Sequence, residues 1–467
     1  MQNKTIDVTE VVDSARLSGL QLGVAILAIF IMLSDGFDLL SISTVAPVLL
    51  KEWSVDDSQM KWVISASMIG MAFGSVALGW LGDRIGRKGA YITCIAFLVV
   101  GSLASAYAVG VWSLFTYRFI TGIGLGGVTP LAATLISEWT PKRIRGMAVA
   151  CVVVAVPLGG MLGAQVAQLV LPVYGWRAIF FIGAALPLVF FVLSWFFLPE
   201  SPRYLSQHVK KHPHLASLLN KMLGENRFDG SENFTVVETA PPPSGKWYSL
   251  LVVLLKPPFL GTTLLLCAAF FFNTLGLYAF ANWLPRVLEY VGLNQHDALQ
   301  GQKLFNFGGF FGAVGGATLI GIYGSRIVGS SLATIGGIAT FFIALAMTAA
   351  MPINPSVQLF VAIWIAGMSL NGMQTFLYAV GANSYPTYIR AYGVGLAQTV
   401  SRIAGVASAA VVSVFLERKI PISSLYFLLT GVFAVVVASY FSMRTHLQGS
   451  KQNRELEAEA IRDGASP

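Results

Sequence analysis

The sequence predicts an all-α polytopic membrane protein with twelve transmembrane helices in two six-helix bundles. First, 55% of its 467 residues are hydrophobic and only 11% are charged, whereas a soluble domain carries about 25% charged residues. Second, the apolar stretches are roughly 18 to 30 residues long, the length at which a helix crosses a ~30 Å hydrocarbon core. Third, these stretches lack the period-two alternation of transmembrane strands. Helices are therefore the expected spans.

The apolar runs fall into two sets of six, separated by a polar connector. Their approximate bounds are 20–50, 58–81, 90–109, 112–138, 147–171 and 176–198, and then 257–285, 304–323, 330–350, 357–384, 392–416 and 422–443. The predicted parts are an N-terminal six-helix bundle over 1–198, a cytoplasmic connector over 199–256, a C-terminal six-helix bundle over 257–443 and a cytoplasmic tail over 444–467. The connector contains three successive prolines, Pro241 to Pro243, which favour a soluble and partly flexible linker.

Basic residues are distributed unevenly between the two ends of these spans. Of the 30 Lys and Arg residues, 21 fall at the end that carries both termini and the connector, and seven fall at the opposite end. The positive-inside rule then predicts that both termini and the connector are cytoplasmic. The net charge of +8 is thus a topology signal and gives no reason to expect a nucleic-acid partner.

The two halves of the chain resemble each other at two loops. The segment Gly79–Ile85 recurs as Gly321–Ile327, and Pro141–Arg145 recurs at nearly the same offset as Pro386–Arg390. Two loops that recur at one offset indicate a duplicated six-helix unit. Such a duplication predicts a central cleft between the halves.

Few charged residues lie inside the spans. Asp35 and Asp38 are deep in the first span and share a helical face, and Arg118 and Arg402 lie in spans four and eleven. Charges at bilayer depth are costly and usually mark ion pathways or partnered sites. We expect the aspartates to bind and release a proton, and the arginines to pair with the aspartates or with a substrate carboxylate. A static salt bridge, a capped helix break near Gly36 and a structural Arg118 stay open as alternatives.

Polar side chains in spans seven, eight and ten are the expected lining of a substrate pocket, because amides in hydrocarbon need partners. These candidates are Asn273, Tyr278, Asn306, Asn371, Gln374 and Tyr378. Asn371 and Gln374 share a helical face at a spacing of three residues, and Tyr378 follows Gln374 at a spacing of four.

The loop 82–88 is interpreted as a conformational latch. Its glycines permit a tight turn, and Asp83 can meet a helix N-terminus or an arginine of a neighbouring helix. The expected gating residues are Gly82, Asp83, Arg84, Gly86, Arg87, Glu138, Arg145 and Arg390. The alternative is that the basic residues of the loop only fix topology. Ser325 replaces Asp83 in the second half, so a weaker latch is expected there.

Several of these segments resemble motifs of the major facilitator superfamily. Gly82–Lys88 resembles its signature loop and Arg118–Gly124 its fourth-helix motif, and Pro199–Arg203 is also found in its sugar-porter-like branches. The segment Asp35–Asp38 resembles the first-helix motif of the aromatic acid:proton symporter family. The resemblance implies the major facilitator fold and a proton-coupled symporter in the bacterial cytoplasmic (inner) membrane. It would import small aromatic carboxylates of the benzoate or hydroxybenzoate type by alternating access.

Two other functions stay open. One is a proton-coupled porter of sugars or other organic solutes, which Pro199–Arg203 favours, although the chain end lacks the Pro-Glu-Thr type of motif usual in sugar porters. The other is an aromatic-acid transporter with an added sensory role. The expected partners are the aromatic acid, protons and the lipid bilayer. We expect a monomer with no enzymatic activity, cofactor or metal. Cys94, Cys151 and Cys267 all fall inside apolar runs, so we infer no redox or metal role for them.

Overall fold

The protein is nearly all helical in its computed structural model, which describes residues 5–236, 252–348, 357–385 and 387–442. The N-terminal elements are β1 (Thr5–Asp7), α1 (Val8–Ser14), α2 (Gly19–Glu52), α3 (Asp57–Ile85), α4 (Arg87–Ala106), α5 (Val111–Trp139) and α6 (Lys142–Phe197). The connector forms α7 (Pro202–Ser206), the 3-10 helix η1 (Val209–Lys211), α8 (His212–Leu223) and β2 (Asn233–Thr235). The remaining helices are α10 (Leu260–Tyr290), α11 (Gln295–Tyr323), α12 (Ser325–Ala346), α13 (Val357–Asn383), α14 (Thr387–Glu417) and α15 (Ile422–Ser442).

Eleven helices of the described residues are long and apolar enough to cross a membrane. Ten of them each match one predicted span, and α6 contains both the fifth and the sixth. The two parts of α6 meet at Gly175, where φ is 73° and ψ is 179°, a conformation essentially restricted to glycine. The backbone is therefore not helical between the two apolar parts of α6. The prediction of a polytopic helical protein is confirmed, and the junction at Gly175 lies between the predicted end of the fifth span at 171 and the predicted start of the sixth at 176.

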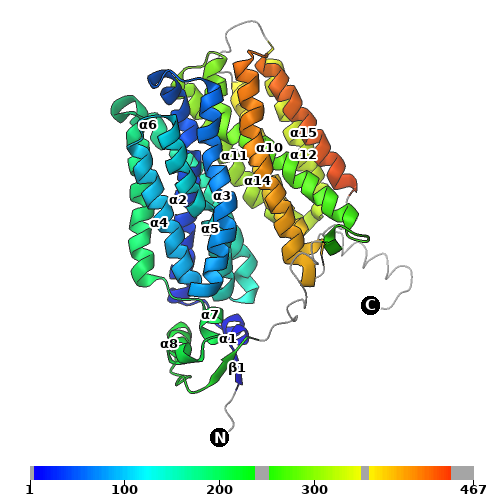
Figure 1. Ribbon diagram of the computed structural model, residues 1–467. Coiled ribbons are helices and arrows are strands. Elements are labelled where there is room, and N and C mark those ends of the chain that lie inside the picture. The colour runs from blue at the N-terminus through cyan, green and yellow to red at the C-terminus, as the bar shows by residue number, and fades with distance from the viewer. Residues whose placement is uncertain (1–4, 237–251, 349–356, 386, 443–467) are drawn as a thin grey trace, which may run out of the picture. The chain divides into compact units, whose positions relative to one another are not determined.

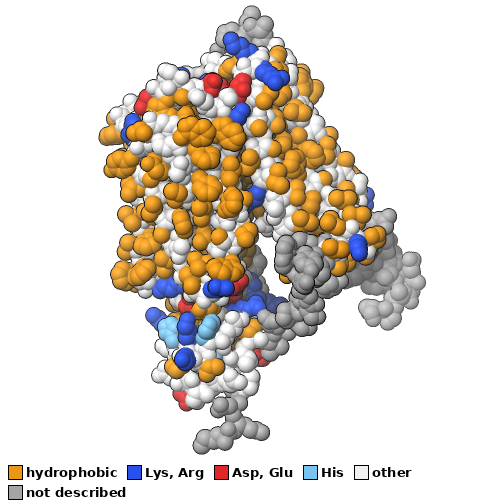
Figure 2. Space-filling view, in the orientation of Figure 1, with side chains coloured by type: hydrophobic (Ala, Val, Ile, Leu, Met, Phe, Trp, Pro, Cys, Tyr) orange, Lys and Arg blue, Asp and Glu red, His pale blue; other side chains and the backbone are white. Residues whose placement is uncertain are grey.

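Several helices extend beyond the apolar runs that predicted them. Helix α11 begins at Gln295, well before the predicted start of the span at 304. The Asn294 side chain accepts a hydrogen bond from the backbone N–H of Asp297 and caps the helix. Hydropathy marks only the apolar part of a helix, so it misses a polar first turn. Figure 2 shows the same division, with apolar side chains covering the visible faces of the helices and charged side chains mostly near their ends.

The chain divides into two compact units. Unit 1 comprises residues 1–41, 66–160 and 170–241, and unit 2 comprises 42–65, 161–169 and 242–467. In unit 1 the long helices lie side by side as a bundle, with α4 packed against α5 (Figure 1). In unit 2, α11 packs against α13, α10 against α14 and α12 against α15. Parts of α2, α3 and α6 thus belong to the same unit as the helices of the second half.

A small subdomain joins the N-terminal segment to the connector. Strand β1 pairs in parallel with β2, so that Ile6 lies opposite Phe234, and Val8, Val12, Leu215 and Phe234 are buried in its core. The elements of this small subdomain lie beyond one end of the helices of unit 1 (Figure 1). The connector is therefore folded over 202–235, where the sequence suggested a partly flexible linker. The prolines Pro241–Pro243 and the tail 444–467 lie outside the described residues.

Candidate functional site

A buried ion pair joins α2 to α5 within unit 1. Arg118 Nη1 donates to Asp38 Oδ2 at 2.9 Å, and Arg118 Nη2 donates to the backbone carbonyl oxygen of Asp38 at 2.8 Å. Ser102 Oγ, from α4, donates to the other carboxylate oxygen, Asp38 Oδ1. Asp38 is 1% exposed, and Arg118 and Ser102 are both 0% exposed. Three helices therefore converge on one carboxylate in what we call the charged cluster: Asp38, Ser102 and Arg118.

Glycines set the position of the two aspartates. A Cβ on Gly36 would lie 2.0 Å from the carbonyl oxygen of Val156, and one on Gly159 would lie 2.0 Å from that of Leu33. Helices α2 and α6 can approach this closely only because both positions lack a side chain. The motif Asp35–Asp38 is thereby held against α6, and Asp35 is as buried as Asp38.

The charged cluster is stable only while each buried ion keeps its partner. Moving an ion out of water costs several kcal/mol even after relaxation, and removing one partner of a buried pair costs about 3–5 kcal/mol. Both carboxylate oxygens of Asp38 have a donor, and the Arg118 guanidinium also lies 5.9 Å from the Phe180 ring centroid. A proton on Asp38 would therefore remove the ionic partner of Arg118, whereas the bond from Arg118 to the Asp38 carbonyl oxygen does not depend on that charge.

A second polar cluster, formed by neutral side chains, joins α10, α13 and α14 within unit 2, and all its members except the half-buried Gln374 are buried. Asn273 Nδ2 donates to Gln374 Oε1 at 2.8 Å and to the Leu370 carbonyl oxygen at 3.3 Å. The hydroxyls of Thr274 and Ser401 lie 2.9 Å apart, and Thr274 Oγ1 lies 3.5 Å from Gln374 Oε1. We call Asn273, Thr274, Gln374 and Ser401 the amide cluster.

The structure brings together only some of the predicted pocket residues. Asn273 and Gln374 meet in the amide cluster, and Tyr378 lies edge-to-face with Phe270 at a centroid distance of 5.4 Å. Asn306 and Asn371 instead donate to carbonyl oxygens of their own helices, those of Gln302 and Gly367. Tyr278 and Arg402 are both half-buried.

Thr274 and Ser401 belong to the amide cluster but were not among the predicted pocket residues. Their position beside Asn273 and Arg402 was the available signal. Ser102 of the charged cluster had no such signal, because small hydroxyl residues are common wherever membrane helices pack closely.

The predicted latch forms a network of charges within unit 1. Arg87 Nη1 pairs with Asp83 Oδ1 at 2.6 Å, and Arg87 Nε lies 3.9 Å from Glu138 Oε1. Ser201 Oγ donates to Glu138 Oε2, and Glu200 Oε1 accepts from the backbone N–H of Lys88 at 3.0 Å. The first residues of the connector are thus tied to the 82–88 loop.

Gly86 holds the turn inside this network. Its φ of 98° is unfavourable for other residues, and a Cβ there would lie 2.2 Å from Glu200 Oε2. Tyr204 Oη donates to the carbonyl oxygen of Arg84 at 3.1 Å, and the Arg84 guanidinium lies 4.0 Å from the Trp80 ring centroid. A Cβ on Gly82 would lie 2.9 Å from the Leu131 side chain.

A cavity of about 370 Å³ opens beside this network of charges. It is lined by Asp83, Arg87, Glu138, Arg203, Tyr204 and Gln207.

The two other predicted gating arginines have different partners. Arg145 pairs with Asp13 of α1, which also accepts from the backbone N–H of Lys142 at 3.1 Å. Arg390 is exposed, and its Nε donates to the Tyr385 carbonyl oxygen at 3.4 Å. Burial raises the pKa of Tyr385, whose hydroxyl donates to Thr263 Oγ1 at 3.1 Å. Of the two arginines, Arg145 ties α6 to the N-terminal segment, because its partner Asp13 lies in α1.

Three ion pairs that the sequence did not single out join segment 42–65 to later helices of unit 2. Arg286 binds Asp57 with both Nε and Nη2, at 2.8 and 2.7 Å. The other two pairs are Lys51 with Glu289 at 3.1 Å and Lys61 with Glu417 at 3.7 Å. These pairs connect the ends of α2 and α3 to α10 and α14.

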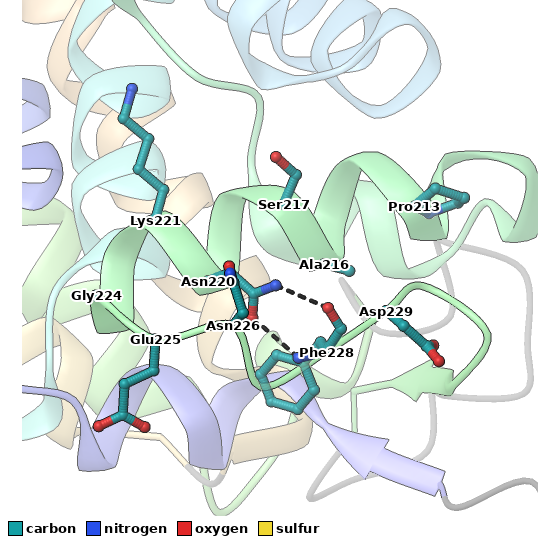
Figure 3. Close-up of a pocket in the computed structure, with 10 residues that line it drawn as sticks. All are labelled: Pro213, Ala216, Ser217, Asn220, Lys221, Gly224, Glu225, Asn226, Phe228 and Asp229. Atoms are coloured by element: carbon teal, nitrogen blue, oxygen red, sulfur yellow. Dashed lines mark hydrogen bonds between the residues drawn. The ribbon is translucent and has the colours of Figure 1, made fainter.

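A further cavity of about 500 Å³ lies on the small subdomain, between α8 and residues 224–229. Figure 3 shows Asn220 at its centre, where the side chain bonds both the N–H and the carbonyl oxygen of Phe228. Asn220 therefore holds the loop in place, and none of the predicted site residues lines this cavity.

Comparison with known proteins assigns the family. The family model described as Major Facilitator Superfamily matches residues 24–409. The 4-hydroxybenzoate transporter PcaK of Pseudomonas putida is 31% identical over 82% of this chain and 83% of its own. The gallate transporter of Pseudomonas putida is 29% identical over 82% of both chains. The benzoate transport protein of Acinetobacter baylyi is 26% identical over 82% of this chain and 81% of its own.

Solved structures show the same fold. The crystal structure of a D-xylose-proton symporter superposes with a TM-score of 0.69 at 18% identity, covering 91% of this chain and 97% of that one. The xylose transporter XylE of E. coli, in an inward open conformation, gives a TM-score of 0.71 at 16% identity, covering 94% of this chain and 99% of that one. The predicted fold and family are confirmed, and the chain belongs to the Major Facilitator Superfamily.

Proposed function

We propose that the protein is a proton-coupled symporter that imports small aromatic carboxylates of the benzoate or hydroxybenzoate type by alternating access. The observation that carries the proposal is the 31% identity to a 4-hydroxybenzoate transporter over four-fifths of the chain. The gallate and benzoate relatives share a carboxylated benzene ring as the chemistry of their named substrates. The protein is therefore a membrane transporter and not an enzyme.

The charged cluster supports a coupling mechanism. Arginine stays protonated in proteins and can hold a carboxylate through two parallel hydrogen bonds. When a proton neutralises Asp38, Arg118 loses its ionic partner and becomes available to the carboxylate of the substrate. Proton release then restores the Asp38–Arg118 pair and frees the substrate. Asp35, three residues away and equally buried, takes part in the same proton transfer.

The amide cluster supports recognition of the rest of the substrate. Asn273 and Gln374 can re-pair with a ring hydroxyl, because an amide both donates and accepts hydrogen bonds. Phe270 and Tyr378 form an edge-to-face pair on the same helices as these amides and can stack against an aromatic ring. Arg402 of α14 is a second candidate partner for the substrate carboxylate.

The proposal includes location and gating. The excess of Lys and Arg at one end supports cytoplasmic termini and a cytoplasmic connector in a bacterial inner membrane. At that end, the ion pairs of Arg87 with Asp83 and Glu138 would act as the gate. The protein would work as a monomer, with an N-terminal bundle over 1–198 and a C-terminal bundle over 257–443.

The test is uptake of labelled benzoate and 4-hydroxybenzoate into cells, with and without a protonophore, by the wild type and Asp35→Asn. We expect accumulation by the wild type that the protonophore abolishes, and accumulation at least about ten-fold lower in the variant, because an intramembrane carboxylate is rarely dispensable. Protonophore-resistant accumulation would contradict the coupling. If the cells took up xylose and no aromatic acid, that result would favour the sugar-porter alternative.

A further inference from the structure

Ser102 binds the carboxylate oxygen of Asp38 that Arg118 does not bind. It lies in α4, is 0% exposed, and donates through Oγ to Asp38 Oδ1. Arg118 serves the other carboxylate oxygen and the backbone of the same residue. Ser102 therefore reaches Asp38 from a different helix than its ionic partner.

The two partners of Asp38 differ in what they can do when it takes a proton. A guanidinium has only N–H donors, whereas a serine hydroxyl is one donor and also an acceptor. The protonated carboxyl group carries an O–H donor, which Arg118 cannot accept. Ser102 Oγ can accept it by rotating its own hydrogen away. Ser102 is thus a hydrogen-bond partner that fits both protonation states of Asp38.

We propose that Ser102 is a positioning residue for the proton-binding step, holding the Asp38 side chain in place while it gains and loses its proton and its contact with Arg118. This inference rests on the proposed proton-coupled symport. Its chemical requirement is a hydroxyl at this point of α4, since an alanine would leave Asp38 Oδ1 without its Ser102 donor in the ionised state.

The other ionisable groups near Asp38 come from the helices around it. Arg118 of α5 pairs with it, and Asp35 lies one turn away on α2. Tyr91 and Cys94 of α4 interact electrostatically with Asp35. The Ser102 substitution leaves all four groups in place, so a change in pH dependence would report on the lost hydroxyl.

Helix α4 supplies a matched control. Ser105 is also 0% exposed, and its Oγ donates to the Gly101 carbonyl oxygen of the same helix at 2.8 Å. Ser105→Ala therefore removes the same atom from another buried position of the same helix and leaves the Ser102–Asp38 hydrogen bond in place. Ser102→Thr keeps a hydroxyl and tests whether that group restores the wild-type behaviour.

The experiment measures initial uptake of labelled 4-hydroxybenzoate across external pH, and counterflow exchange at equal pH on both sides, in proteoliposomes. In Ser102→Ala both forms of Asp38 lose a hydrogen bond, but the bond to the carboxylate is the stronger of the two because it is made to a charged group, so the protonated form persists to higher pH. We expect the half-maximal pH to rise by about one unit, the difference between a hydrogen bond to a charged group and one to a neutral group. Counterflow should continue, because it needs no net proton release.

The outcomes separate this inference from the proposed function. An unchanged profile in Ser102→Ala, or an equal shift in Ser105→Ala, overturns the role of Ser102 while leaving symport intact. Ser102→Ala without counterflow also overturns it if Ser102→Thr is equally inactive, because the position would then be purely structural. A wild type with no uptake or counterflow of aromatic acids would instead contradict the proposed function.

Discussion

The two buried polar clusters of this protein differ in the kind of partner that they require. The charged cluster of unit 1 holds an arginine and a carboxylate that are both almost fully buried, so each depends on the other. The amide cluster of unit 2 is built from neutral amides and hydroxyls. An ion that loses its partner in the interior costs several kcal/mol, whereas an amide costs about 1–3 kcal/mol.

This difference assigns different tasks to the two clusters. The ion pair of the charged cluster can break only when a proton neutralises Asp38 or another anion binds Arg118. The amide cluster can exchange one neutral partner for another at little cost, since interhelical hydrogen bonds in membranes average only about 0.6 kcal/mol. Strict coupling is therefore expected from unit 1 and adjustable recognition from unit 2.

The largest expected effect comes from breaking the buried ion pair. Arg118→Ala leaves the Asp38 carboxylate buried and uncompensated, so we expect about 3–5 kcal/mol of lost stability and uptake reduced at least about 100-fold. Adding Asp38→Asn removes the stranded charge. The double variant should recover most of the stability but not the uptake. Thermal unfolding in detergent and uptake of labelled 4-hydroxybenzoate measure the two effects.

Recovery of uptake in the double variant would show that the pair only stabilises the fold. Arg118→Lys is a second control, because it keeps the charge and loses the two-pronged geometry. We expect it to be more stable than Arg118→Ala and still poorly coupled.

The charged members of the charged cluster could be recognised from the sequence because charge inside a membrane span is rare. Asp38 and Arg118 stood out with Asp35 and Arg402 as soon as the spans were marked, but the sequence left open which arginine pairs with which aspartate. Ser102 could not be recognised in the same way, since its role comes from the packing of α4 against two other helices. A sequence pattern does not show how closely Ser102 of α4 approaches Asp38 of α2.

Neutral polar residues were harder to interpret for a physical reason. An asparagine within a helix can donate to the carbonyl oxygen four residues earlier, as Asn306 and Asn371 do. It then needs no partner on another helix. The pairing of β1 with β2 was also missed, because two three-residue strands more than 200 residues apart leave no local hydropathy signal. The Arg145 pairing with Asp13 depends on that same folded subdomain.

An intermediate effect is expected from the amide cluster. Gln374→Leu removes the acceptor of Asn273 and the neighbour of Thr274, so we expect KM for 4-hydroxybenzoate to rise about five- to twenty-fold, equivalent to one or two hydrogen bonds. The proton dependence should stay as in the wild type. The measurement is the concentration dependence of initial uptake at two external pH values.

Asn371→Leu on the same helix is the matched control for Gln374→Leu. Its amide bonds only to the Gly367 carbonyl oxygen among the hydrogen bonds that the structure shows for it, so a smaller change in KM is expected. A larger effect at Asn371 than at Gln374 would place recognition outside the amide cluster. A changed proton dependence in Gln374→Leu would contradict the division of tasks between the two units.

The smallest expected effect comes from the arginine–carboxylate pair of unit 2. Arg286 and Asp57 bind each other through two hydrogen bonds, and their side chains are 21% and 10% exposed, against 0% and 2% for Arg118 and Asp38. Water that reaches the edge of this pair lessens the cost of leaving one partner alone, so Arg286→Ala should lower the uptake rate only about two- to five-fold. The double variant Asp57→Arg with Arg286→Asp exchanges the two charges and should recover the uptake rate of the wild type. An Arg286→Ala defect as severe as that of Arg118→Ala would mean that burial is not what separates the two pairs, and the contact between α3 and α10 would then be as essential to transport as the charged cluster.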